Sequence, residues 1–201
     1  MSEIKINVSI GEALDKLTIL DIKLFKIKDD RVNDVKIEYN YLYTELKNYV
    51  EEFKYHYDFL KKVNLDIWEL QDEVRAEQSN FISKCEDILF LNDARFTIKN
   101  KINNLAKSKF KEQKGYPKRK VCIITGDLTS EMLDKVLYVS VFYDEVYVNT
   151  SSSNTSELSS KDSTIIFTSE IQIDGMDIIN YTNIGPVNNI THPYLKKTLK
   201  F

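Results

Sequence analysis

The chain has 201 residues, with 28 Lys and Arg against 31 Asp and Glu, which gives a formal net charge of −3. Hydrophobic residues make up 42% and charged residues 29%, as is typical of globular proteins rather than disordered chains. No apolar run approaches the ~20 residues that span a bilayer, and two cysteines cannot form a disulfide framework. We therefore expect a cytoplasmic protein without a membrane span.

Glycine and proline are distributed unevenly along the chain. Residues 1–114 contain one glycine and no proline, whereas the other four glycines and all three prolines follow. Because these residues interrupt regular structure, their absence predicts long helices in the first part. We expect a helical bundle over 1–116 and a second domain over 117–201.

The first predicted helix begins at Ser9, which forms a capping box with Glu12. Its apolar residues recur every three or four positions: Ile10, Leu14, Leu17, Leu20, Leu24 and Ile27. A second helix is predicted over 31–64, where a heptad repeat places Val32, Tyr39, Leu46, Phe53 and Leu60 on one stripe. Such a helix packs into a bundle or coiled coil, and we expect it to pair with a second copy in a dimer.

Two further helices are predicted to begin at Asp66 and Asn92, each at a local capping pattern. After the connector, apolar runs at 121–124, 146–148, 165–167 and 178–179 indicate strands, with a helix at about 130–143. The predicted fold class is therefore α+β with two domains. A bundle of about four helices precedes a small Rossmann-like α/β domain with about four mainly parallel strands.

The candidate site lies on the third and fourth predicted helices. Asp72 and Arg75 are three residues apart, and Arg95, Lys99 and Asn103 follow one another at intervals of four. One interpretation is an interhelical ion-pair network, and we favour it because buried charges in bundles usually pair with each other. The other is an anion site, in which Arg95 and Lys99 bind a phosphate or carboxylate and Asp72 orients Arg75.

Other chemistries have less support in the sequence. The pairs Glu12/Asp15 and Glu69/Asp72 have the spacing of helical Mg²⁺ ligands, but this spacing is common on solvated helices. The basic stretch 95–120 fits a helix end and linker better than a nucleic-acid surface. We expect no metal, no cofactor, no nucleic-acid partner and no catalytic residue.

Several motifs resemble a helical family of unknown function found in bacteria and large DNA viruses. The segment 8–20 resembles the family's opening, V-S-I-G-E-L-x-D-K-L-T-I-L-E-I-K. Further matches are Ile67-Trp68-Glu69 with Asp72 and Arg75, Asn92-Asp93 with Arg95, Ile98-Lys99, Ile102-Asn103, and the segment 111–116. The resemblance implies an association with glycosyltransferase-like domains. Residues 124–146 are weakly similar to the start of such a domain, here truncated.

Three functions follow from these observations. The first is a non-catalytic accessory or scaffold protein of glycan assembly, which associates with itself through the long helix and has a glycosyltransferase as a possible partner. The second is a glycosyltransferase-related enzyme or remnant with a phosphate or sugar-nucleotide site. The third is a structural interaction protein unrelated to sugars. For a viral member of the family, the expected location is the host cytoplasm.

Overall fold

The computed structural model describes residues 4–76, 79–113, 119–125, 136–149, 164–167 and 178–184. The chain divides into two compact units, Met1–Gln113 and Lys114–Phe201. No helix in the described part of the chain is both long and apolar enough to cross a membrane.

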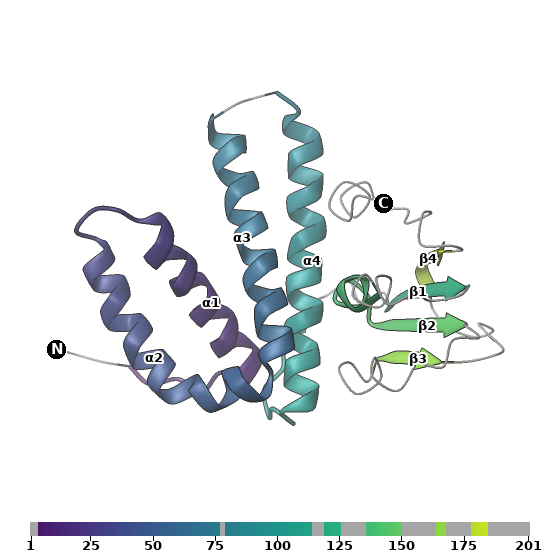
Figure 1. The fold of residues 1–201 in the computed structure, drawn as a ribbon, viewed down its shortest axis with the longest axis horizontal. Helices are drawn as coiled ribbons and strands as arrows, with labels where there is room; N and C mark the ends of the chain where they lie inside the picture. The colour runs from purple at the N-terminus through teal and green to yellow at the C-terminus, as the bar shows by residue number, and fades with distance from the viewer. Residues whose placement is uncertain are drawn as a thin grey trace. The chain divides into compact units, whose positions relative to one another are not determined.

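The first unit consists of four helices: α1 (Ile10–Lys26), α2 (Val32–Glu52), α3 (Lys54–Ala76) and α4 (Phe81–Leu105). Helices α3 and α4 form the longer of two hairpins, and α1 with α2 forms the other (Figure 1). Helices α1 and α3 each contact all three of the other helices, so the unit is built around these two.

The predicted start of α1 is confirmed. Ser9 is the N-cap residue, and its Oγ accepts a hydrogen bond from the amide of Glu12 at 3.2 Å. The apolar stripe is buried in its middle, at Leu14, Leu17 and Leu20, and half-buried at its two ends. Local capping and periodic burial agree here, so the sequence pattern predicts the helix correctly.

The single helix predicted over 31–64 is wrong, because the chain is interrupted at Phe53. This residue has φ −107° and ψ 29°, outside the α-helical range, and separates α2 from α3. The heptad stripe itself is buried on both sides of the break, at Leu46, Phe53 and Leu60. The bend lets α2 pack mainly on α1, while α3 packs on α1 and α4. One straight helix over residues 31–64 would be about twice as long as α1, which has 17 residues. About half of its apolar stripe would then extend past the end of α1.

The predicted starts of the third and fourth helices are also wrong. Asp66 lies in the middle of α3, and Asn92 lies eleven residues inside α4, which begins at Phe81. Both positions resemble an N-cap, because each has a polar residue with an acid shortly after it. Each helix nevertheless continues through the position, because the apolar residues on either side are buried against a neighbouring helix.

The second unit contains a parallel sheet in the order β3-β2-β1-β4. Its strands are β1 (Arg119–Thr125), β2 (Glu145–Asn149), β3 (Ile165–Phe167) and β4 (Ile178–Ile184). Strand β1 pairs with β2 and β4, and β2 pairs with β3.

The predicted fold class is nevertheless wrong, because no Rossmann-like domain is shown. Such a domain has helices on both faces of its sheet, whereas the described residues after 116 add only one short helical segment, 136–140, to strands of three to seven residues. The regular structure of the described residues is mainly the four long helices. Apolar runs predict strands, but they do not establish the layers of helices that pack over them.

Candidate functional site

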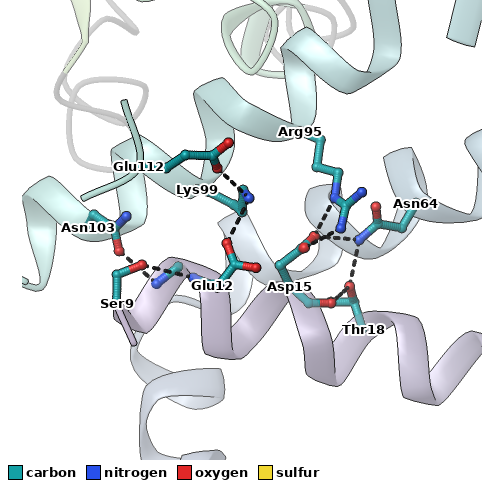
Figure 2. Close-up of polar contacts among 10 residues, drawn as sticks. Ser9, Glu12, Asp15, Thr18, Asn64, Arg95, Lys99, Asn103 and Glu112 are labelled. Atoms are coloured by element: carbon teal, nitrogen blue, oxygen red, sulfur yellow. Dashed lines mark hydrogen bonds and ion pairs between the residues drawn. The ribbon is translucent and has the colours of Figure 1, made fainter. Parts of the chain in front are cut away.

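A group of polar side chains lies where α1, α3 and α4 meet, and we call it the polar cluster (Figure 2). Its members are Glu12, Asp15 and Thr18 of α1, Asn64 of α3, Arg95, Lys99 and Asn103 of α4, and Glu112. Several of these residues are almost inaccessible, among them Asp15, Thr18 and Asn103. Buried polar groups require partners, so the arrangement of this cluster constrains how the helices pack.

The helical period of α1 places its polar cluster residues on one side of the helix. Gly11, Asp15 and Thr18 are spaced by four and three residues, so they lie on one face of the helix, and all three are buried. This polar face runs beside the apolar stripe that includes Leu14 and Leu17. Helix α1 therefore presents two buried faces of different chemistry.

Asp15 and Arg95 form the central ion pair. Arg95 Nε donates to Asp15 Oδ1 at 2.8 Å, and its Nη2 donates to Oδ2, so the guanidinium binds both carboxylate oxygens. The Asp15 side chain is 2% exposed and that of Arg95 27%. The hydrogen bond to Asp15 raises the pKa of Arg95 against the opposing effect of burial. Arg95 therefore keeps its positive charge in this position.

Asn64 and Thr18 complete the surroundings of Asp15. Asn64 Nδ2 donates to Asp15 Oδ1 at 2.9 Å and lies 2.8 Å from Thr18 Oγ1. The Thr18 hydroxyl donates to the backbone carbonyl of Asp15 at 2.7 Å. Three helices thus meet at a single carboxylate, which fixes their positions relative to one another.

Lys99 lies between two carboxylates. Its Nζ is 2.9 Å from Glu12 Oε2 and 2.6 Å from Glu112 Oε2, while its side chain is 9% exposed. Burial lowers the pKa of Lys99, but the hydrogen bonds to Glu112 and Glu12 and the nearby charge of Asp15 outweigh it, and the pKa is raised. Lys99 is therefore a fixed positive charge.

Asn103 of α4 binds a backbone amide in the first turn of α1. Its Oδ1 accepts a hydrogen bond from the amide of Gly11 at 2.7 Å. A Cβ at position 11 would lie 2.5 Å from the carbonyl oxygen of Lys99, so only glycine allows α1 and α4 to approach this closely. The nitrogen of the same amide, Nδ2, is buried and has no hydrogen-bond partner among the residues that the structure describes.

The structure separates the five residues of the predicted site. Arg95, Lys99 and Asn103 lie together on α4, as their spacing predicts. Asp72 and Arg75 pair with each other on the exposed surface of α3, at 3.2 Å. Asp72 follows Asn64 by eight residues, which places it about 12 Å further along the helix axis.

Sequence reasoning missed the partners that complete the cluster. Arg95 pairs with Asp15, which is 80 residues away, and Lys99 pairs with Glu12 and Glu112. The signal for Asp15 was its spacing from Gly11 and Thr18, which places it on one face of α1. Asn64 occurs inside the heptad region and carries no comparable signal.

The chemistry of the cluster is that of paired charges. Three carboxylates face two cations, and each of these charged groups has an opposite partner. Within the described ranges, no group of three or more His, Cys, Asp or Glu side chains is placed to hold a metal ion. The Glu12/Asp15 pair, which has the spacing of Mg²⁺ ligands, binds protein cations instead.

Comparison with known proteins identifies the family of the helical unit. A model of a family of unknown function, DUF6165, matches residues 4–127. No curated protein and no solved structure matches the chain. The match spans all four helices, including every member of the polar cluster. The chain therefore belongs to the DUF6165 family, whose function is unknown.

Proposed function

We propose that the protein is a non-catalytic accessory or scaffold protein that associates with a second copy of itself through α2. The observation that carries this proposal is the exposed apolar face of α2. Only Leu46 of its 21 residues is buried, while Ile37 is 72% and Tyr41 61% exposed. Since α2 packs mainly on α1, one side of the helix is left without a neighbour in the helical unit.

A second copy fits this face by its apolar character. Ile37 and Tyr41 are one helical turn apart, so they lie on the same side of α2. Pairing of two α2 helices would place these side chains of one copy against those of the other and remove them from water.

The non-catalytic part of the proposal is supported by the polar cluster. Each of its charged groups is paired with an opposite charge, whereas a general acid or base needs access to a substrate. The side chains of Asp15 and Lys99 are 2% and 9% exposed, and each is held in an ion pair, so neither has such access. A structural role in fixing three helices accounts for their positions.

Light scattering at micromolar concentration tests the association. We expect the wild type to be a dimer and Ile37→Glu to be a folded monomer, because the substitution places two charges in the interface. Ile82→Glu is the matched control, since Ile82 is an equally exposed isoleucine on α4. A wild type that remains monomeric on tenfold concentration would refute the proposal. Dissociation by Ile82→Glu alone would place the interface on another face.

A second candidate function is the binding of a phosphate-bearing ligand at Arg95, Lys99 and Asn103. The buried amide nitrogen of Asn103, which lacks an acceptor, favours it. The link with glycan assembly rests on the family resemblance, and a sugar nucleotide is the phosphate ligand that would connect the two. Calorimetric titration with uridine diphosphate and with inorganic phosphate tests this candidate. Binding that is lost in Lys99→Gln would support it.

A further inference from the structure

The carboxylate of Glu112 comes from outside the helices. Helix α4 ends at Leu105, and the following residues to Gln113 are not helical. Lys107 has φ 50°, a left-handed conformation that turns the chain back, and the amide of Ser108 donates to the carbonyl of Asn103 at 2.9 Å. The segment 106–113, which we call the connector, thus returns along α4 and brings Glu112 to Lys99 (Figure 2).

The two carboxylates on Lys99 are held differently. Glu12 belongs to the first turn of α1, where its amide is capped by Ser9 and its charge suits the positive end of the helix. Glu112 lies on a segment without regular structure, and its side chain is 40% exposed. Both side chains are partly exposed, that of Glu12 at 50%, so the difference between them lies in the backbone: Glu12 is carried by a helix and Glu112 by the connector.

Two donors on this side of α4 suit an oxyanion. Lys99 and Asn103 are one turn apart, so their side chains are neighbours on the helix surface. Asn103 is 1% exposed, and its Nδ2 faces away from Gly11 and has no acceptor within the described part of the chain. An ammonium group beside a buried amide donor matches a phosphate group, which has several acceptor oxygens, better than a single carboxylate.

We propose that Lys99 and Asn103 form a phosphate site in which Glu112 is an internal occupant, and that a bound phosphate group displaces Glu112 and releases the connector. This inference rests on the second candidate function above and adds its regulation. The connector leads directly into the second unit at Lys114. Ligand binding at Lys99 therefore changes how the last segment of the first unit is held.

The variant Glu112→Gln tests the displacement. It removes the competing charge and leaves Lys99, Asn103 and the helices unchanged. We expect this variant to bind inorganic phosphate and uridine diphosphate about tenfold more tightly than the wild type. This factor corresponds to the lower end of the free energy that one charge-assisted hydrogen bond contributes. Glu86→Gln is the matched control, because Glu86 is an exposed glutamate on α4 outside the polar cluster. Its affinity should equal that of the wild type.

Limited trypsin digestion gives a second measurement. Cleavage after Lys107, Lys109 and Lys111 should be faster in Glu112→Gln, and faster in the wild type with phosphate than without it. Equal phosphate affinity in Glu112→Gln and the wild type would overturn the displacement and leave the anion site in place. If no variant binds phosphate or uridine diphosphate at millimolar concentration, both the anion site and its regulation are refuted. The dimer proposal is independent of either result.

Discussion

Replacing Asp15 by Asn gives the most direct test of the polar cluster. The substitution keeps the shape of the side chain but removes the charge that Arg95 binds through two nitrogens. Breaking a buried ion pair on one side costs about 3–5 kcal/mol, because the other charge stays behind without a partner. Arg95 is 27% exposed and gains some hydration, so we expect the free energy of unfolding to fall by about 2–3 kcal/mol.

The structure offers a matched control on the neighbouring helix. Asp72 also pairs with an arginine, Arg75, but both side chains are more than half exposed. Exposed pairs contribute about 0–1 kcal/mol, so Asp72→Asn should change the stability by less than 1 kcal/mol. The two variants make the same chemical change and differ in burial.

Urea unfolding followed by far-ultraviolet circular dichroism measures the difference, because the long helices of the first unit dominate that signal. Asp15→Asn should lower the transition midpoint without changing the slope. Equal midpoints for Asp15→Asn and Asp72→Asn would refute the assignment of Asp15 as the buried centre of the cluster. A native-like dichroism spectrum before unfolding shows that the variant has folded.

Two further predictions concern close packing and pH. Gly11→Ala should destabilise the helical unit by about 1–3 kcal/mol in the same assay, because the added Cβ would lie 2.5 Å from the carbonyl oxygen of Lys99. A gain in stability, the usual result of Gly→Ala inside a helix, would contradict this close approach. Burial, followed by the charge of Asp21, raises the pKa of the Tyr57 hydroxyl above its ordinary value of about 10. The unfolded chain loses this proton first, so the contribution of Tyr57 to stability is complete below pH 10 and falls as the pH rises above it. The difference in unfolding free energy between Tyr57→Phe and the wild type should therefore depend on pH above 10, and a constant difference would contradict the prediction.

The sequence predicts the helices where local signals and burial agree. The cap at Ser9 and the spacing of Leu14 and Leu17 define α1 without tertiary information. The heptad stripe correctly identifies Leu46 and Leu60 as buried. The break at Phe53 was not predictable from composition, because neither glycine nor proline marks it. It arises from the packing of α2 on α1 and of α3 on α4.

The candidate site could also be predicted only in part from the sequence. The spacing of Arg95, Lys99 and Asn103 along one helix is sufficient to place them together, because neighbours on a helix surface follow from its period. Their partners come from elsewhere in the chain: Asp15 is 80 residues before Arg95, and Glu112 follows a reversal of the chain at Lys107. Local sequence determines which face a side chain occupies. Only the tertiary structure determines which charge it meets, since an ion pair depends on the distance between helices and not on the pattern within either one.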